Sequence, residues 1–423
     1  MRVGIVSGEY PPDVGGVGDQ AARLAAELAS GGHDVQVVTS ARNRSAPIPV
    51  AAPTGAAGAP PAPRPPGPAV LPAVRRWDWR LFALLPRLAR EGRWDVLHLQ
   101  YQPGAFQLDG TINLLPGWLR RRRDAPAIVT TFHDLRVPYL FPKAGRLRPL
   151  AVRLLARACD GIAAAEPGDV RQLDAWTGDL APPPAVRRIP LGNALDVAPP
   201  AGFDRAAWRA RLGLDADAAL AGHFGFVNRT KGVDILVEAV RRLVDGGRDV
   251  ALLMIGDPLG SSDPTNAAYL DAVRQRVAAA GLRSRVHWTG YCPPADVAGW
   301  LRCLDVAVLP FSEGASRRRT SIQAAWAQGV PVLTTVPATP DPGAPGGLEG
   351  AAVVPPNDAA ALAAALGDLL DRPERRAALA LAGPRLAAAF AWPAVAAATL
   401  DLYVAALSRR AASRAAGRAA APV

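Results

Sequence analysis

Short apolar runs alternate with helical patterns along the first half of the chain. Residues 18–31 carry leucines and alanines at helical spacing, and 77–90 show the same period. Because strand patterns and helix patterns take turns, this half is predicted to form a parallel sheet with helices on both faces. The predicted strands are 2–7, 35–40, 95–100, 127–134 and 161–166.

The second half of the chain repeats this rhythm. The first predicted helix of this half is 206–214. Three more follow: one starts after residue 232, one ends at residue 280, and one starts after residue 293. The predicted strands are 220–227, 250–257, 286–290, 306–311, 330–335 and 351–356. A chain of 423 residues is long for one domain. We therefore predict two sequential α/β halves of similar size, with a ligand between them as the default expectation.

Two segments depart from the rhythm. Residues 45–73 are dominated by proline, alanine and glycine, which cannot sustain a helix or a central strand, so we predict a flexible or extended surface insertion. Residues 408–423 spread arginines among alanines and are predicted to be a frayed tail.

Composition limits the class of protein. Half of the residues are apolar and 20% are charged, which is typical of a globular protein. Cys159, Cys292 and Cys303 are too few and too widely spaced for a disulfide framework or a metal cluster. No apolar stretch approaches a membrane span, and the chain enters a strand without a signal region, so we expect a cytoplasmic protein.

The net charge of +11 comes almost wholly from arginine, since Lys143 and Lys231 are the only lysines. This excess suits anionic partners such as sugar nucleotides, acidic lipid surfaces or nucleic acid. Nucleic acid ranks last, because aromatic residues make up 6% of the chain and no nucleic-acid motif is present.

The stretch 306–335 carries the clearest chemistry. A predicted buried strand is followed by a polar loop with one acid, Glu313, and three consecutive arginines, and then by a helix start at Thr320 or Ser321. Side-chain charge and the free N–H groups of a helix start would point the same way, which predicts a site for a phosphorylated ligand. The alternative is a run of solvated arginines, but this run follows the carboxyl end of a strand, where open α/β sheets bind ligands. The three arginines are Arg317, Arg318 and Arg319.

Two glycine loops have the same strand–loop–helix form. The sequence VGGVG at 14–18 fails as a dinucleotide fingerprint, because its loop is too long and the second strand ends without an acid for a ribose. Its glycines instead predict close approach of the backbone to a phosphate or a sugar, with a plain flexible turn as the alternative. The loop GFVNRTKG at 225–232 places Lys231 at a helix start, with Arg229 two residues before it.

A series of motifs in this order resembles glycosyltransferase family 4 over nearly the whole chain. The motifs are EYPPDVGGVGDQAARLAAELASGGHDVQVVTS, IPLGNALD, GFVNRTKGVDILVEAV, ALLMIGD, VHWTGYCPPADVAGWLRCLDVAVLPF, AQGVPVLTT and VVPPNDAAALAAALGDLL. The resemblance implies an α/β fold of the GT-B type, with two Rossmann-like domains facing a cleft and a final helix returning to the first domain.

The resemblance also implies domain boundaries. An amino-terminal acceptor domain would span 1–196 and a carboxyl-terminal nucleotide-sugar donor domain 197–388. A helix over 389–407 would cross back to the first domain, and a disordered tail would follow over 408–423. Such enzymes transfer sugar with retention of configuration, generally without a metal or a cofactor.

Several residues match the motifs of this family. Lys231 matches the phosphate-binding lysine, and Gly16 and Gly18, with Gly15 beside them, match the glycine loop near the donor phosphates. His133 matches a histidine that often contacts the reacting sugar or the acceptor; a structural histidine is the alternative. Phe226 stands where many members carry an arginine, which leaves Arg229 or the arginines at 317–319 as substitutes. A leaving diphosphate needs such preorganised cations.

The chief departure from the family concerns its paired glutamates, which usually stand eight residues apart. Counted back from Gly329, the second glutamate position is Ala324, with Gln323 beside it. The first position falls on Ser316, or on Glu313 if the loop is three residues longer. In relatives the second glutamate tends to hold the ribose hydroxyls. The arginine triplet therefore marks either a rearranged phosphate loop or a weakened site.

The resemblance implies a retaining, metal-independent hexosyltransferase. Glu313 and His133 are its predicted catalytic residues, and Ser316, Thr320 and Ser321 are further predicted contacts. The alternatives are a nucleotide-sugar binding or regulatory protein and a nucleotide-sugar epimerase. The predicted partners are a nucleotide-sugar donor and a carbohydrate, lipid-linked or small-molecule acceptor. The basic stretches 74–90 and 114–126 leave open a peripheral contact with the inner membrane face. The alternative, which we favour, is that their apolar faces pack on the sheet.

Overall fold

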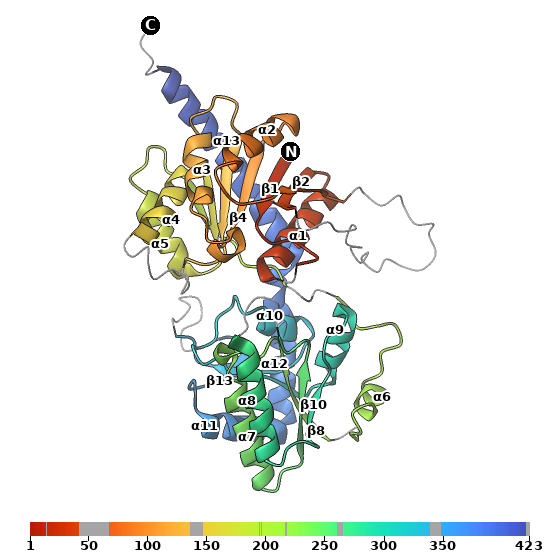
Figure 1. Cartoon of the computed structure of the whole chain (residues 1–423). Helices are drawn as coiled ribbons and strands as arrows, with labels where there is room; N and C mark the ends of the chain where they lie inside the picture. The colour runs from red at the N-terminus through yellow and green to blue at the C-terminus, as the bar shows by residue number, and fades with distance from the viewer. Residues whose placement is uncertain are drawn as a thin grey trace. The chain divides into compact units, whose positions relative to one another are not determined.

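The computed structural model describes residues 1–13, 15–41, 67–135, 147–193, 195, 197–215, 218–259, 265–338 and 348–419. The chain divides into two compact units (Figure 1). The first unit consists of Met1–Gly192 together with Trp392–Val423, and the second consists of Asn193–Ala391. Each unit has its own sheet of parallel strands flanked by helices, which confirms the predicted α/β class.

The described part of the first unit contains a seven-stranded sheet in the order β3-β2-β1-β4-β5-β6-β7. Neighbouring strands are parallel throughout. This arrangement follows from helices inserted between successive strands, since a parallel pair needs a crossover connection. The strands are β1 (Arg2–Ser7), β2 (Asp34–Ser40), β3 (Ala69–Val74), β4 (Val96–Tyr101), β5 (Ala127–Phe132), β6 (Gly161–Ala164) and β7 (Ala185–Arg188).

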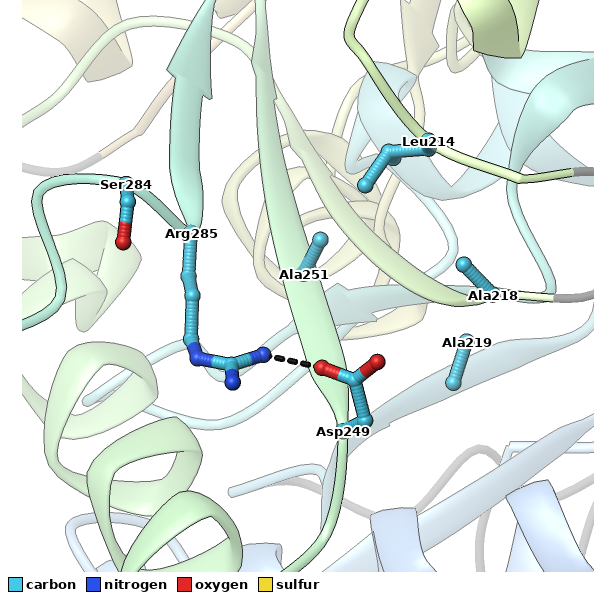
Figure 2. A pocket seen from close by; sticks show the side chains of 7 residues that line it. All are labelled: Leu214, Ala218, Ala219, Asp249, Ala251, Ser284 and Arg285. Carbon is cyan, nitrogen blue, oxygen red and sulfur yellow. Dashed lines mark hydrogen bonds and ion pairs between the residues drawn. The ribbon is translucent and has the colours of Figure 1, made fainter.

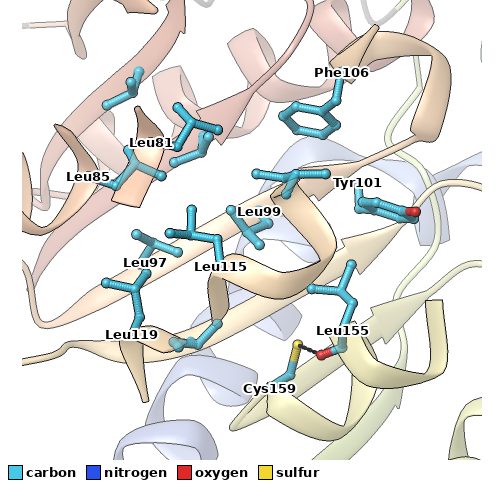
Figure 3. Packing of buried hydrophobic residues seen from close by; sticks show 14 of the residues in the cluster. Leu81, Leu85, Leu97, Leu99, Tyr101, Phe106, Leu115, Leu119, Leu155 and Cys159 are labelled. Atoms are coloured by element: carbon cyan, nitrogen blue, oxygen red, sulfur yellow. Dashed lines mark hydrogen bonds between the residues drawn. The ribbon is translucent and has the colours of Figure 1, made fainter. Parts of the chain in front are cut away.

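Helices cover both faces of this sheet. On one face, leucines of α2 and α3 pack over Leu97 and Leu99 of β4, with Phe106 beside them (Figure 3). On the other face, α1 and α13 contact each other, and α13 also contacts β5, β6 and β7. The helices are α1 (Gly16–Ser30), α2 (Leu81–Glu91), η1 (Pro103–Phe106), α3 (Thr111–Leu119), α4 (Leu147–Ala158), α5 (Pro167–Thr177) and α13 (Trp392–Ala419).

The two basic stretches of this unit use their apolar residues inside the core. In α2, Leu81 and Leu85 are buried, and in α3, Leu115 and Leu119 are buried. The apolar faces therefore pack on the sheet, as expected if the surrounding arginines are solvated. Trp79 is the large apolar side chain that remains exposed beside α2.

The proline-rich segment differs in part from its prediction. Its last residues form β3, which pairs with β2 at the edge of the sheet. Pro72 lies within this strand, and an edge strand tolerates proline because one side of its backbone needs no ladder bonds. The rest of the predicted insertion, 45–66, lies outside the described residues.

The prediction of a frayed tail over 408–423 was wrong for its first residues, because α13 continues as a helix to Ala419. Arg409 and Arg410 in this stretch are buried. The Arg409 guanidinium donates to the Asp160 carboxylate at 2.7 Å, and it also donates to the backbone oxygens of Cys159 and Pro182. Arginine-to-carboxylate and arginine-to-carbonyl bonds therefore hold this part of α13 to the rest of the first unit.

Replacement of Arg409 by alanine is expected to destabilise the first unit by about 3 kcal/mol, because the fully buried Asp160 loses the cation at 2.7 Å and keeps only Arg120 at 3.9 Å. Urea unfolding of the full chain measures this change. The matched control is Val404→Ala on an exposed face of the same helix, expected to change stability by less than about 0.5 kcal/mol. Equal stability in both variants would contradict a packed end of α13.

The expectation that no stretch approaches the length of a membrane span was also wrong. One helical run, Pro373–Ala415, is long and apolar enough to cross a membrane by length and composition. It includes α12 and α13, which are separated by η4 (Ala388–Phe390) and by Ala391 in an extended conformation. Within its apolar window, 44% is buried. In α13 the apolar side chains Leu402 and Tyr403 pack in the core of the first unit, which is the behaviour of a core helix.

The described part of the second unit contains a six-stranded sheet in the order β10-β9-β8-β11-β12-β13. One face packs against α9, α10 and α6 around Trp300 and Trp326, and the other packs against α7, α8 and α11. Its strands are β8 (Ala219–Phe224), β9 (Val250–Ile255), β10 (Val286–Trp288), β11 (Val306–Leu309), β12 (Val332–Thr335) and β13 (Ala351–Val354). Its helices are α6 (Arg205–Ala210), η3 (Arg229–Lys231), α7 (Val233–Asp245), α8 (Thr265–Ala279), α9 (Pro294–Cys303), α10 (Thr320–Ala327), α11 (Ala359–Asp371), α12 (Pro373–Ala387) and η4 (Ala388–Phe390).

Candidate active site

Two loops of the second unit meet at the carboxyl ends of neighbouring strands. β8 and β11 pair side by side, and the loops that follow them lead to α7 and α10. Ser312 joins the loops, because its N–H donates to the Thr230 oxygen and its hydroxyl donates to the Arg229 oxygen, both at 3.1 Å. Asn357 donates to the Ser312 oxygen at 3.2 Å. The sequence-predicted loops 225–232 and 312–319 are therefore one structural site.

Gly232 explains how closely these loops approach. It has a φ of +63° and caps α7, so the backbone adopts a conformation that L side chains rarely take. A Cβ on this residue would lie 2.0 Å from the Pro310 oxygen, at the end of β11. The start of α7 consequently lies directly against the end of β11.

Lys231 and Arg319 lie over the same aromatic ring. The Lys231 Nζ is 5.1 Å from the ring centre of Phe311, and the Arg319 Cζ is 4.4 Å from it. Phe311 is fully buried, so the ring supplies a fixed surface for both cations. Burial, together with the nearby Arg319 charge, lowers the pKa of Lys231 to about 8. Two cations held this close favour an anionic ligand.

The lowered pKa of Lys231 predicts that the binding of a diphosphate ligand depends on pH. Lys231 is charged below about pH 8 and loses its proton as pH rises through this value, so affinity for a diphosphate should fall above pH 8. Titration calorimetry between pH 6.5 and 9.5 should show a break in log Kd near pH 8. Lys231→Arg keeps its charge over this range, and its profile should lack the break. The same break in both proteins would contradict this assignment.

The start of α10 contains buried polar atoms that face no protein partner. Within the described chain, Ser316 Oγ, Ser321 Oγ and Gln323 Oε1 are buried without a hydrogen bond. Buried polar atoms are normally hydrogen-bonded, so a cluster of exceptions at a helix start indicates a place for a ligand. Gln323 Nε2 donates to the Arg317 oxygen at 2.7 Å, which fixes the turn before the helix.

The remaining residues of the arginine loop are placed around this cluster. α10 begins at Thr320, as predicted. Arg317 and Arg318 are half-buried in the turn before it. Glu313 is exposed, with one carboxylate oxygen 3.8 Å from the Arg319 guanidinium. Glu313 thus lies at the rim of the site, beside the cation that also contacts Phe311.

Arg229 faces a hollow on the side of α8. Its guanidinium lies 5.9 Å from the ring centre of Tyr269, whose hydroxyl donates to the Asp234 carboxylate at 2.6 Å. The hollow has a volume of about 480 Å³, and Asn228, Arg229 and Asn266 are among the residues that line it. Arg229 is therefore available to a ligand next to the Lys231 loop.

Ala324 lies inside the core of the second unit. Its side chain is fully buried and belongs to the apolar cluster around Trp326 and Phe311. The position at which the resemblance predicts the second glutamate is thus part of the packed core in this chain.

The other predicted residues lie in the first unit. His133 directly follows β5, and its backbone N–H donates to the backbone carbonyl oxygen of Tyr101 at the end of β4. Its Nε2 is 2.8 Å from Gln100 Oε1. Burial lowers the pKa of His133 to about 4, so the imidazole is neutral near pH 7. His133 and the glycine loop both follow strands of one sheet, at its carboxyl edge.

The glycines of the first loop, Gly15, Gly16 and Gly18, differ in what surrounds them. A Cβ on Gly15 would lie 2.3 Å from a carboxylate oxygen of Glu9, and a Cβ on Gly18 would lie 3.0 Å from the backbone nitrogen of Tyr10. These two glycines make room for the chain itself. Gly16 has open space around its Cβ direction among the described residues, and it is the position where a ligand can approach.

A separate hollow lies at the other edge of the second sheet (Figure 2). It has a volume of about 150 Å³, and Asp249 and Arg285, which form an ion pair there, directly precede β9 and β10. Open α/β sheets bind ligands at the carboxyl ends of their strands, and this hollow is at the amino ends. This rule favours the joined loops after β8 and β11 over this hollow as the place for a ligand.

Sequence reasoning missed several members of the site. The sequence pattern places Phe311 only at the end of a strand and Ser312 only in a polar loop. In the structure, Lys231 and Arg319 both lie over the Phe311 ring. Gln100 was part of a predicted strand. The sequence does carry a signal for Phe311, because an apolar run ends there in a large aromatic residue beside a cationic loop. It carries no comparable signal for Gln100. In the described residues, no group of three or more His, Cys, Asp or Glu side chains could hold a metal ion.

Comparisons with known proteins agree with this architecture. A family model described as glycosyl transferase 4-like domain matches residues 15–192, and one described as glycosyl transferases group 1 matches residues 219–372. The D-inositol 3-phosphate glycosyltransferase of Xylanimonas cellulosilytica is 31% identical over 345 residues, which cover 76% of this chain and 74% of that protein. The same-named protein of Thermobispora bispora is 29% identical over 75% of this chain and 72% of that protein.

Solved structures show the same fold. Sucrose-phosphate synthase from Thermosynechococcus elongatus has a TM-score of 0.64 at 22% identity, and covers 95% of this chain and 98% of its own. HepE from Anabaena, in complex with UDP-glucose, has a TM-score of 0.66 at 18% identity, and covers 95% of this chain and 99% of its own. The fold is GT-B, and the protein is a glycosyltransferase. The chain belongs to glycosyltransferase family 4.

Proposed function

We propose that the protein moves a sugar from a nucleotide-sugar donor to an acceptor with retention of configuration. The observation that carries this proposal is the cationic pair of Lys231 and Arg319 over Phe311, beside the buried polar atoms at the start of α10. Together they would bind the donor diphosphate and stabilise the charge that develops on it as the sugar leaves. Arg229 would assist from the side of α8.

The supporting names come from the comparisons. One similar structure contains UDP-glucose, and the curated relatives are named as D-inositol 3-phosphate glycosyltransferases. The acceptor of this chain is accordingly proposed to be a hydroxyl-bearing carbohydrate, lipid-linked or small molecule that meets His133. Glu313 would orient the sugar or the acceptor. No metal or cofactor enters this proposal, because arginine and lysine side chains supply the positive charge.

The buried Ala324 favours one second candidate, a protein that binds nucleotide sugars without turnover. Without a carboxylate for the ribose hydroxyls, the donor would depend on phosphate contacts alone. The two functions differ in product formation.

The test is a thermal-shift screen of UDP-, GDP-, ADP- and TDP-sugars, followed by proton NMR of reactions with each donor that binds. The proposal expects a new glycoside whose anomeric configuration equals that of the donor. An inverted product would contradict retention, and binding without hydrolysis or transfer would support the second candidate.

A further inference from the structure

A chain of buried polar side chains connects His133 to the C-terminal helix. His98 and Gln100 are two residues apart in β4, so they lie on the same face of the sheet, and both are buried. Gln100 Oε1 is 2.8 Å from His133 Nε2, and Gln100 Nε2 is 3.2 Å from His98 Nε2. His98 Nδ1 is 2.7 Å from the hydroxyl of Tyr403 in α13. All four residues belong to the first unit.

The amide of Gln100 sets the direction of these hydrogen bonds. An amide oxygen only accepts, so His133 Nε2 must carry a proton and donate it to Gln100 Oε1. An amide nitrogen only donates, so His98 Nε2 must present a lone pair to Gln100. The Thr131 hydroxyl, 2.8 Å away, can donate to that same lone pair. In a neutral imidazole the other nitrogen then carries the proton, so His98 Nδ1–H donates to the Tyr403 oxygen.

Both histidines are neutral near pH 7, which gives the tautomer its importance. Burial, together with the nearby His133, lowers the pKa of His98 to about 3. The rings of His98 and Tyr403 meet edge to face, with their centres 5.5 Å apart. Packing and hydrogen bonds therefore fix His98, and His98 in turn fixes the amide of Gln100.

We propose that Gln100 is the positioning residue of His133, held in one orientation by His98 and Tyr403. It keeps the proton of His133 on Nε2 and leaves the Nδ1 lone pair to accept a hydrogen bond from a hydroxyl group of the sugar or the acceptor. This inference rests on the proposed function only for its effect on turnover. The assignment of the tautomer stands on the geometry of the first unit alone.

The experiment uses the full chain labelled with ¹⁵N-histidine, because five histidines give few signals. Long-range proton–nitrogen correlation spectra near pH 7 distinguish a protonated ring nitrogen from one with a lone pair. The wild-type spectrum should show His133 protonated at Nε2 and His98 protonated at Nδ1, with assignments from His133→Asn and His98→Asn. The opposite tautomer of His133 would overturn the proposal.

Two variants test the direction of the coupling. Gln100→Leu has a similar volume and removes both amide partners, so His133 should become a mixture of tautomers. Tyr403→Phe removes one hydroxyl and should move the His98 signals most and the His133 signals less. Gln275→Leu, at an exposed position of α8, is the matched control and should leave both histidines unchanged. His133 signals that do not move in Gln100→Leu would overturn the proposal.

Kinetics separate this proposal from the proposed function. Gln100→Leu should lower kcat by about 10²-fold, because a misplaced catalytic contact costs about that much, with little change in the KM of the donor. A change of tautomer without any turnover in the wild type would keep the positioning role and reject the transferase. An unchanged kcat alongside an altered tautomer would reject the role of His133 in transfer.

Discussion

Alanine in place of Lys231 is expected to lower kcat for sugar transfer by about 10²- to 10³-fold, the usual cost of losing one preorganised group that stabilises developing negative charge. The Lys231 ammonium lies over Phe311 with Arg319, and Lys231 is the lysine of the loop between β8 and α7. Initial rates at saturating donor, with the donor found in the screen, measure the effect.

Protein stability separates this loss from a folding defect. Burial and Arg319 lower the pKa of Lys231, so its charged form is disfavoured in the folded chain. Removal of this charge should leave the thermal midpoint unchanged or slightly raised. Arg283→Ala removes an exposed charge from the same unit and should leave the rate unchanged. A Lys231→Ala enzyme with the wild-type rate would contradict the assigned donor site.

Glutamate in place of Ala324 is expected to destabilise the second unit by about 3–5 kcal/mol and not to restore a ribose contact. The Ala324 side chain is fully buried in an apolar cluster, so a carboxylate there would lose its hydration and displace packed apolar groups. Burial raises the pKa of a carboxyl group, so stability should fall as pH rises above about 4 and recover at lower pH.

Two controls separate charge from size in this measurement. Ala324→Gln adds nearly the same volume without a charge, so its stability should change little with pH over the same range. Ala377→Glu adds the same carboxylate at an exposed position of α12 and should change stability by less than about 0.5 kcal/mol. Wild-type stability together with tighter donor binding in Ala324→Glu would show that position 324 lines the donor site.

Much of the fold could be predicted from the sequence because its strands are short apolar runs that repeat with helices between them. β3 escaped this pattern, since its proline and alanine residues form an edge strand by pairing with β2 alone. The end of α13 was not predicted, because arginines such as Arg409 and Arg410 are usually surface residues, and here they are buried. Their burial depends on carbonyl and carboxylate partners far away along the chain.

The candidate site was predictable only in its charged parts. Lys231 and the arginine triplet follow predicted strands, and a sheet with parallel strands brings such loops to one edge. Phe311 was missed because its role depends on two loops meeting. Gln100 was missed because its role depends on contacts with His133 and with His98, which in turn contacts Tyr403, about 300 residues away along the chain. No local pattern encodes such contacts.

Hydrogen exchange with and without donor tests the central claim most directly, namely that the donor binds at the joined loops after β8 and β11. Mass spectrometry of the full chain, at donor concentrations far above Kd, locates the protected amides. We expect slower exchange in 225–235 and 312–323, and unchanged exchange in 281–286 beside the hollow of Asp249 and Arg285. Protection at that hollow, or unchanged exchange in both loops while donor is bound, would contradict the claim.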